Sequence, residues 1–549
     1  MKEIKLATQH GLSHRGTPIC NFSVGLSNIY YWADGPAKGS LAFLRLVITT
    51  DTARYEELIQ ATGYSRLSFL RRHPDLSVTR KGLEILDLHI AGLVADRIRE
   101  SDTGLAFSQT GFHHLENRTV FVAGNRLIGG EDLDVIFAPE ISNFHLTEAV
   151  LPPREISEEL LNRLQAINPE IAVPVFAFGI LTALQSLVLE CGIPLTSVLY
   201  LNGQSGLGKT ETVKKFFALY DFTKSKLPAL ITEAGSTMAG FRENLCSARD
   251  LPVVLDDLCL SSAKDSQRKR LEIGAQVIRE ASNKGAMRIK AGNHGTESST
   301  EAGVAITAEF NMRSISDVTR CIIVTLERPM DGGKSDDRTI AAGALDAFLT
   351  WFIPRYQQEK EHLEQRYNGL QTKGRLDRLK TGLFCLYWAF DCFMRFVRDT
   401  GAITASTYNQ VDQFWKGILQ QIEHRQRQLI ACIDAKIPKV SIQELLWAGI
   451  QNHAIPLVNK PKKLDSFHGL IKGNDFFLPP LLLDEFLSNQ DGYQSITRTA
   501  ISRELKAAGI LVLHKNDHAN TVKSKKGGPR VLHIRLDLLR KNVERIHGL

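Results

Sequence analysis

A glycine-rich segment followed by a lysine and a threonine carries the clearest chemical pattern in the sequence. Residues 203–210 read Gly-Gln-Ser-Gly-Leu-Gly-Lys-Thr, which fits the P-loop pattern G-x-x-x-x-G-K-[ST]. In such a loop the backbone N–H groups wrap phosphates, Lys209 reaches the β- and γ-phosphates, and Thr210 binds Mg²⁺. We therefore expect a site for ATP and Mg²⁺, and an ordinary strand-turn-helix is the alternative. The expected nucleotide-binding residues are Gly203, Gln204, Ser205, Gly206, Leu207, Gly208, Lys209, Thr210 and Glu211.

Two adjacent carboxylates end the apolar run Leu251-Pro-Val-Val-Leu-Asp-Asp257. After a P-loop, an acid at the end of a strand typically holds Mg²⁺, and a second one positions the attacking water. We assign Asp256 to the metal together with Thr210, and Asp257 to the base that orients and deprotonates the water. The alternative is a strand end that is simply capped by acids.

Other polar residues follow the later apolar runs. Thr307, Glu309 and Asn311 all compete for the position of a sensor that detects the γ-phosphate, and we expect catalytic roles for Glu309 and Asn311. Arg320 directly precedes the run Cys321 to Leu326, where the additional-strand class of P-loop ATPases places an arginine that acts on a neighbouring subunit. A local salt bridge is the alternative for Arg320.

Basic residues at two places suit a polyphosphate backbone. Arg288 and Lys290 would share one face of a hairpin inserted before residue 303, because strand side chains alternate. A solvated loop is the alternative. Near the C-terminus, Lys523, Lys525 and Lys526 form a basic turn between two predicted strands, 510–514 and 530–535. This turn follows predicted helices at 441–453, 480–488 and 497–508. Helices followed by a hairpin are the order of a winged helix, which binds DNA or, alternatively, protein.

The elements that position these residues alternate between strands and helices. A strand at 198–201 and a helix at 211–219 flank the P-loop, and a helix at 173–189 precedes that strand. Further strands are predicted at 229–232, 251–257, 303–311 and 321–326. Residues 1–150 show short β segments, with helical spacing at 52–63 that continues into 67–72, and again at 82–99. The aromatic segment 111–124 predicts a hairpin in which His113 and His114 are structural, and we find no catalytic pattern in this region.

The predicted fold is an α/β P-loop ATPase core of the additional-strand class, AAA+-like, between an N-terminal β-rich domain and a C-terminal winged helix. The core is expected at 151–345, a helical lid and linker at 346–437, and the last domain at 438–549. At the start of a lid helix, Arg375 or Arg378 is a candidate second nucleotide sensor. The long helices 348–367, 375–398 and 411–437 belong to the lid and linker.

Composition sets limits on class and location. The 549 residues suggest three or four domains, and a net charge of +7 does not by itself identify a nucleic-acid binder. Eight cysteines occur without a C-x-x-C pair, which favours reduced thiols over disulfides or zinc. The N-terminus lacks an apolar signal core, so we expect a cytoplasmic protein without a membrane span.

The sequence resembles a family of P-loop ATPases that carry a domain of unknown function and are encoded by mobile genetic elements and prophages. This family includes the Cch-type self-loading helicases of staphylococcal cassette chromosomes. Relatives commonly show Asp-Glu and Thr-Gly-Glu where this chain has Asp256-Asp257 and Thr307-Ala-Glu309. The resemblance covers roughly residues 15 to 400 and rests on Gly111-Phe-His-His, Phe121-Val-Ala-Gly, the P-loop, Leu255-Asp-Asp, the hairpin around Lys290, Thr307-Ala-Glu and Arg320.

This resemblance implies a ring motor, a homo-hexamer or another ring, related in design to replicative helicases of the MCM type. It would translocate on single-stranded DNA or a forked duplex during replication of a mobile element. One rival function is a DNA-binding initiator or assembly switch that hydrolyses ATP without translocating. A second rival is a small-molecule kinase, which would need neither the arginine acting in trans nor a basic winged helix.

Overall fold

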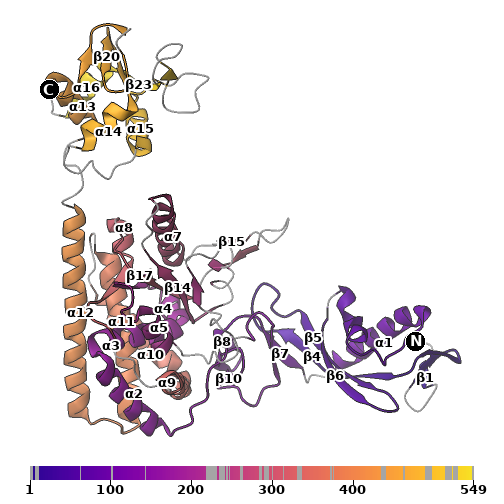
Figure 1. Ribbon diagram of the computed structural model, residues 1–549. Coiled ribbons are helices and arrows are strands. Elements are labelled where there is room, and N and C mark those ends of the chain that lie inside the picture. The colour runs from indigo at the N-terminus through magenta and orange to yellow at the C-terminus, as the bar shows by residue number, and fades with distance from the viewer. Residues whose placement is uncertain are drawn as a thin grey trace. The chain divides into compact units, whose positions relative to one another are not determined.

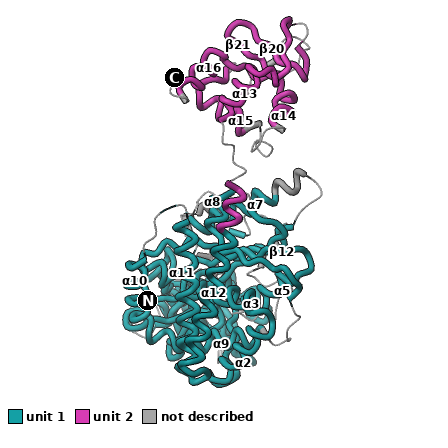
Figure 2. Tube along the Cα trace, turned by 90° about the vertical axis from the view of Figure 1, so that its left-hand side faces the viewer, with its two compact units in different colours: residues 1–426 teal, residues 427–549 magenta. Residues whose placement is uncertain are grey.

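The computed structural model of the protein divides into two compact units, residues 1–426 and 427–549 (Figures 1 and 2). The four-domain division expected from the sequence remains a prediction. The residues that the structure describes are 4–6, 11–61, 63–99, 103–142, 144–217, 231–233, 241–242, 245, 248–259, 264–283, 287–289, 296–298, 301–312, 314–330, 337–370, 374, 376–434, 441–461, 464–488, 498–512, 522–523 and 530–546.

The N-terminal part of the first unit is built on a five-stranded sheet with the order β11-β7-β4-β5-β6. Helix α1 (Arg80–Arg97) packs its buried side chains Leu86, Ile90 and Val94 into the same core as β4 and β5. The strands are β4 (Ser23–Trp32), β5 (Leu41–Thr49), β6 (Arg54–Gln60), β7 (Gly104–Phe107) and β11 (Val135–Phe137). A smaller sheet precedes it, formed by β1 (Ile4–Leu6), β2 (Leu12–His14) and β3 (Thr17–Cys20).

The helical spacing expected at 52–63 is wrong, because most of this segment is the edge strand β6. Glu57 and Ile59 are buried while the residues on either side of each are exposed, which is the period of a strand. β6 pairs with β5 along its whole length. Seven residues are too few to distinguish the two periods from sequence alone, and the partner strand decides between them. The 3-10 helix η1 (Gly63–Arg71) follows β6.

The expected aromatic hairpin is confirmed as β8 (Gly111–Leu115) and β9 (Arg118–Val122), with the short strand β10 (Leu127–Ile128) beside β9. Phe112 and Phe121 contact edge to face, with ring centroids 5.0 Å apart. Phe112 also lies 4.9 Å, between ring centroids, from Tyr356 of α10 (Tyr356–Asn368). The hairpin therefore packs against the helices of the core.

The core holds a parallel sheet with the strand order β13-β14-β17-β12-β18. β17 separates the P-loop strand β12 from the acid-bearing strand β14, so the additional strand expected from the sequence is present. The α/β class is confirmed by this arrangement. The strands are β12 (Val198–Gly203), β13 (Ile231–Glu233), β14 (Pro252–Leu258), β17 (Gly303–Ala308) and β18 (Cys321–Leu326).

Helices surround this sheet (Figure 1). The expected helix at 173–189 is two helices, α3 (Pro169–Ala183) and α4 (Gln185–Glu190), and α3 is buried from Ile171 onward. The expected helix at 348–367 is interrupted by η2 (Ile353–Arg355), where Pro354 cannot continue the hydrogen-bond ladder. The remaining helices are α2 (Pro153–Ile167), α5 (Lys209–Phe216), α7 (Lys264–Asn283), α8 (Ile315–Val318), α9 (Asp337–Phe352), α11 (Asp377–Asp399) and α12 (Ala405–Asp434).

The second unit combines helices with a sheet of order β19-β20-β21-β23-β22. The expected helices at 480–488 and 497–508 are found as α14 (Pro480–Ser488) and α15 (Arg498–Ala507). Leu511 forms a bridge to Ile534 of β23 (Arg530–Arg535). The other elements are α13 (Ile442–Gln451), β19 (Leu457–Val458), β20 (Gly469–Lys472), β21 (Asp475–Leu478), β22 (Val522–Lys523) and α16 (Leu536–Ile546).

Among the described residues, none of the helices combines the length and the apolar character that a membrane crossing requires.

Candidate nucleotide site

The P-loop links the end of β12 to the start of α5. Gly206 and Gly208 have φ values of 80° and 87°, which a residue with a Cβ rarely adopts. α5 begins at Lys209, so the N–H groups of its first turn face the loop. The Lys209 ammonium donates to the carbonyl oxygens of Gly203 and Gln204, at 2.8 Å each, and is thereby held inside the loop.

Asp256 lies directly beside the P-loop threonine. Its Oδ1 atom accepts hydrogen bonds from Thr210 Oγ1 at 2.8 Å and from Thr307 Oγ1 at 2.6 Å. A hydroxyl and a carboxylate are the hard oxygen donors that Mg²⁺ prefers, so this pair fits the metal expected from the sequence. The start of α5, the acid-bearing strand β14 and the additional strand β17 therefore meet at Asp256.

A bulge in β14 places the two acids. Leu255 pairs with Ile306 and Leu258 with Ala308, so Asp256 and Asp257 together face the single residue Thr307. Thr307 accepts from the Asp257 N–H at 2.9 Å while its own hydroxyl donates to Asp256. One buried threonine therefore orients both acids.

Asp257 has a different environment from Asp256. Its φ is +61°, a left-handed conformation that is uncommon for residues other than glycine, and its side chain is exposed. Asp256 thus accepts hydrogen bonds from two hydroxyl groups, whereas the side chain of Asp257 is open to water.

The candidate sensors differ in their contacts. Asn311 accepts at Oδ1 from Asn202 Nδ2 at 2.8 Å, which ties it to the end of the P-loop strand. The backbone N–H of Glu309 donates to the Leu258 carbonyl at 3.1 Å, and Glu309 is half-buried. Sequence reasoning missed Asn202, although a polar residue just before a P-loop in an otherwise apolar strand is a usable signal.

Arg320 lies where the strands of the sheet begin, at the edge formed by their amino ends. The P-loop lies at the opposite edge, formed by their carboxyl ends. The Arg320 carbonyl accepts from the N–H of Val198, the first residue of β12, whereas the P-loop follows the last residue of that strand. β12 has six residues, and at about 3.3 Å each they separate the two edges by about 20 Å. The Arg320 guanidinium is therefore too far from the P-loop of its own subunit to touch a phosphate there.

Like charges gather around Arg320. Its Nη1 atom donates to the Ser316 carbonyl at 2.7 Å, and the pKa of Arg320 is lowered by burial and then by the nearby charge of Arg378. The buried Asp317 pairs with Arg279 through a contact of 3.1 Å. Arg378 belongs to the start of α11, which packs against the beginning of β12, where a Cβ on Gly382 would meet Ser197. Arg378 and Arg320 thus share the same edge of the sheet.

The basic residues expected to bind DNA are described only in part. Arg288 is in strand β15 (Met287–Ile289), which pairs antiparallel with β16 (Thr296–Ser298), so the expected hairpin is present. Lys523 belongs to β22, which pairs with β23. Four residues of the sequence-based interpretation lie outside the described residues: Lys290, Arg375, Lys525 and Lys526.

A buried polar cluster joins the β8–β9 hairpin to the start of the acid strand. Asp250 accepts from the N–H groups of Phe112 at 2.9 Å and Ser186 at 2.7 Å, and burial raises its pKa to about 6. Burial also lowers the pKa of His113 to about 4, and this imidazole contacts the Gln109 carbonyl at 3.0 Å. The structural role expected for His113 agrees with these contacts.

Comparisons with known proteins bear on the fold. No family model and no curated protein matches the sequence. A solved structure described as SCCmec type IV Cch, an active helicase, is similar with a TM-score of 0.55 at 12% identity, covering 99% of this chain and 98% of that one. The C-terminal region of NrS-1 in its apo form has a TM-score of 0.26 at 10% sequence identity, and the match covers 92% of this chain and 96% of that one. JCV helicase has a TM-score of 0.20 at 12% sequence identity, and the match covers 49% of this chain and 74% of that one. Of these three structures, the Cch structure has a TM-score above 0.5, which shows a shared fold, and the likeness extends over nearly the whole chain.

Proposed function

We propose that the protein is an ATP-dependent DNA helicase or translocase that works as a ring oligomer on single-stranded DNA. The observation that carries the proposal is the meeting of Thr210, Asp256 and Thr307 beside the P-loop. This is the arrangement that ATP hydrolysis needs, and it occurs in a chain that shares its fold with an active helicase. We further propose that the core is AAA+-like, that the protein acts in replication of a mobile element, and that it is cytoplasmic.

In this proposal each residue of the site has a distinct task. Lys209 binds the β- and γ-phosphates, and Thr210 with Asp256 holds Mg²⁺, which neutralises phosphate charge when bound. The exposed Asp257 orients the attacking water and accepts its proton. Asn311, held by Asn202, detects the γ-phosphate, and the half-buried Glu309 is the alternative sensor. Glu211 flanks the loop at the start of α5.

The proposed ring follows from the position of the arginines. Arg320 and Arg378 lie together at the edge of the sheet away from their own P-loop. Each has a fixed positive charge that no acid within hydrogen-bonding distance neutralises among the described contacts, and Asp317 is already paired with Arg279. We infer that both arginines complete the site of a neighbouring subunit, as finger and second sensor, in a hexamer or another closed ring.

The proposed contacts with DNA involve both units. Arg288 and Lys290 would bind the backbone from the β15–β16 hairpin. In the second unit, α13, α14 and α15 are followed by the Leu511 bridge and the β22–β23 pair, an order that supports a winged helix. Lys523, Lys525 and Lys526 would then contact phosphates from the turn between the last two strands.

Strand displacement on forked DNA tests the proposal. The wild type should unwind the fork with ATP, and Lys209→Ala should abolish both hydrolysis and unwinding. A variant with Arg288→Ala and Lys290→Ala should keep ATP hydrolysis without DNA near the wild-type rate, because neither residue belongs to the nucleotide site. It should lose unwinding and most of the stimulation of hydrolysis by DNA.

The variant with Lys523, Lys525 and Lys526 replaced by Ala is the comparison. This variant should bind DNA more weakly than the wild type, with the larger deficit at low salt, because the loss of phosphate contacts makes the affinity fall less steeply as salt rises. It should still unwind forks on which it is preloaded. Normal unwinding by the hairpin variant would contradict the translocation model. Hydrolysis without any unwinding by the wild type would favour the assembly switch.

A further inference from the structure

One buried amide side chain of α12 lies against the strand that follows Arg320. Gln426 is 1% exposed, although the residues on either side of it, Arg425 and Arg427, are exposed. An amide leaves water at little cost only where the protein itself satisfies its hydrogen bonds. The partners of Gln426 therefore show what this side chain holds in place.

Two of these partners belong to the edge of the core sheet. β18 is the last strand of that sheet and pairs on one side, with β12. On its other side, Gln426 Oε1 accepts from the Ile323 N–H at 3.1 Å and Gln426 Nε2 donates to the Cys321 carbonyl at 2.8 Å. A residue of a neighbouring parallel strand would bond to the same two groups. The Gln426 amide thus takes the place of one strand residue at this edge.

The third partner lies on the other side of Arg320. Gln426 Nε2 also donates to the Val318 carbonyl at 3.2 Å. Val318 is the last residue of α8, where carbonyl groups lack partners within the helix. Val318 and Cys321 enclose Thr319 and Arg320 in the chain. One amide therefore holds the turn that carries Arg320 at both of its ends.

The direction of the Arg320 guanidinium depends on this turn. Its Nη1 atom donates to the Ser316 carbonyl of α8 at 2.7 Å, and the Arg320 carbonyl accepts from the Val198 N–H at 2.8 Å. α8 has four residues, and so short a helix has little stability of its own. Contacts from outside α8 must therefore fix the place where the arginine begins.

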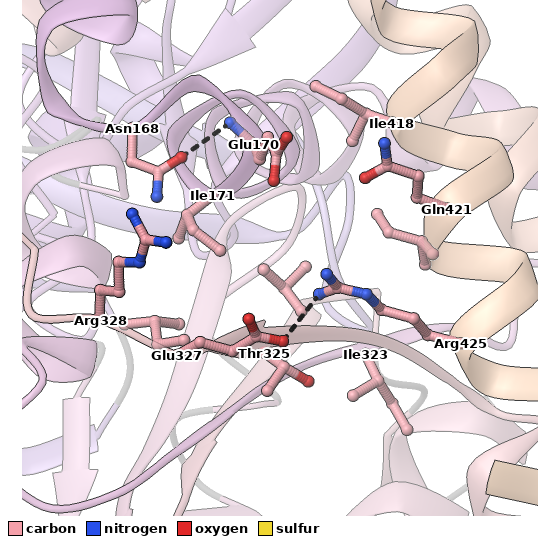
Figure 3. Close-up of a pocket in the computed structure, with 13 residues that line it drawn as sticks. Asn168, Glu170, Ile171, Ile323, Thr325, Glu327, Arg328, Ile418, Gln421 and Arg425 are labelled. Atoms are coloured by element: carbon pink, nitrogen blue, oxygen red, sulfur yellow. Dashed lines mark hydrogen bonds and ion pairs between the residues drawn. The ribbon is translucent and has the colours of Figure 1, made fainter. Parts of the chain in front are cut away.

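A second contact between α12 and the β18 segment is weaker. Arg425 lies 3.5 Å from Glu327, the residue after β18, as the close-up shows (Figure 3). Both side chains are more than half exposed, and an ion pair in water contributes little. The buried amide of Gln426 is the stronger constraint on this segment, because its hydrogen bonds do not compete with water.

We propose that Gln426 is a positioning residue for the arginine that acts on the neighbouring subunit. Its amide fixes the turn 318–321 and so sets the direction of the Arg320 side chain. The proposal rests on the proposed function, because it assumes that Arg320 completes the site of a neighbouring subunit. It implies a one-sided defect: a subunit with an altered Gln426 keeps its own P-loop and does not supply its arginine.

Gln426→Met keeps the length of the side chain and removes its hydrogen bonds. In the full-length protein it should lower ATPase activity at least about thirtyfold, because misplacing a catalytic group by about 1 Å costs on the order of 100-fold. Gln413→Met is the matched control, since Gln413 is an exposed glutamine of the same helix. The control should hydrolyse ATP near the wild-type rate.

Mixing variants shows which side of the subunit interface is defective. Equal amounts of Gln426→Met and Lys209→Ala should recover about one quarter of wild-type activity, because about a quarter of random interfaces pair an intact P-loop with a positioned arginine. Gln426→Met mixed with Arg320→Ala should gain nothing over the two variants alone, since neither supplies that arginine. A general loss of stability would not produce this difference between the two mixtures.

Recovery between Gln426→Met and Arg320→Ala would overturn the proposal, because the altered subunit would then still supply its arginine. Near-normal activity of Gln426→Met alone would overturn it as well. If Gln426→Met does not fold, Gln426→Asn takes its place in both mixtures, since its amide is one methylene too short for the same contacts. Failure of both variants to fold would assign Gln426 to the fold and end the positioning role.

The mixture of Arg320→Ala with Lys209→Ala separates the two proposals. If this pair does not recover activity, the action of Arg320 on a neighbouring subunit fails, and the role of Gln426 fails with it. If this pair recovers while Gln426→Met with Lys209→Ala does not, the proposed function stands and the role of Gln426 is wrong.

Discussion

Asp256 and Asp257 are neighbours in the chain with different surroundings. Asp256 accepts two hydroxyl hydrogen bonds, from Thr210 and Thr307, whereas Asp257 is exposed and has a left-handed backbone. A carboxylate held between hydroxyls suits a metal, and an exposed one beside it suits a water. The bulge in β14 thus gives two identical side chains two different tasks.

Amide substitution separates these tasks. Asp257→Asn should lower kcat of ATP hydrolysis by about 100-fold or more with little change in nucleotide affinity, because it removes only the proton acceptor. Asp256→Asn should also weaken the binding of Mg²⁺, seen as a higher metal concentration for half-maximal activity. Near-normal hydrolysis by Asp257→Asn would move the base to another residue.

His113 makes stability depend on pH. Its pKa is lowered to about 4 by burial and by Arg249, with Asp34 acting in the opposite direction from 3.8 Å. The unfolded chain binds a proton near pH 6.5 and the folded protein does not, so protonation favours unfolding as the pH falls from 6.5 to 4. The free energy of unfolding is therefore not reduced by this group above pH 6.5, and it falls as the pH drops from 6.5 to 4.

His113→Gln removes this titration and keeps a side-chain donor for the Gln109 carbonyl. Relative to the wild type, the variant should gain up to about 3 kcal/mol in free energy of unfolding between pH 6.5 and pH 4. Urea unfolding at several pH values measures the difference. A difference that stays constant with pH would show that His113 does not titrate in this way. Asp250 is present in both proteins, so its raised pKa cancels in the comparison.

At the scale of elements, the β8–β9 hairpin fastens the N-terminal sheet to the core. Gly111 has a φ of 92°, and a Cβ there would lie 2.5 Å from Asp250 Oδ2 and 2.9 Å from the Arg249 carbonyl. The same Asp250 carboxylate accepts from the Phe112 N–H. Asp250 is two residues before β14, so the hairpin and the acid strand share one buried anchor.

Gly111→Ala should destabilise the protein by about 3 kcal/mol or more, because it adds a clash with buried backbone to the cost of a left-handed alanine. Gly39→Ala is the matched control, since Gly39 has a φ of 80° and nothing within 4 Å of its Cβ position. The control should lose only about 1 kcal/mol. Equal losses in chemical denaturation would mean that the close approach of hairpin and core does not contribute.

At the scale of the whole molecule, a single subunit contains all the proposed catalytic groups but does not bring them together. The P-loop and Asp256 lie at one edge of the sheet, and Arg320 and Arg378 at the other, about 20 Å away. The proposed ring would bring the second edge of one copy against the first edge of the next. Under this proposal, assembly is a requirement for hydrolysis.

Mixing two inactive variants tests this requirement. Arg320→Ala supplies an intact P-loop and Lys209→Ala an intact arginine, so equal amounts assembled at random should restore about one quarter of wild-type ATPase activity. Each variant alone should remain inactive. No recovery at any ratio, with mixed oligomers verified by size, would contradict the action of Arg320 on its neighbour.

Much of the fold follows from local patterns. The P-loop required a strand before Gly203 and a helix after Gly208, and both are present, because the turn and the glycines are encoded within a few residues. The strand at 321–326 and the helix at 480–488 are also found with the expected limits, since each is a continuous apolar or amphipathic run. In contrast, β6 was misjudged because its identity depends on its partner β5.

What the sequence alone determined about this protein is therefore the chemistry of its local motifs: a phosphate loop, paired acids and a polar residue at the end of each later strand. The tertiary structure decided how they are combined. The bulge that separates Asp256 from Asp257, the bond between Asn202 and Asn311, and the position of Arg320 at the far edge all depend on strand pairing between distant segments. No local pattern encodes such contacts, because each forms only when residues distant in the chain meet across the sheet.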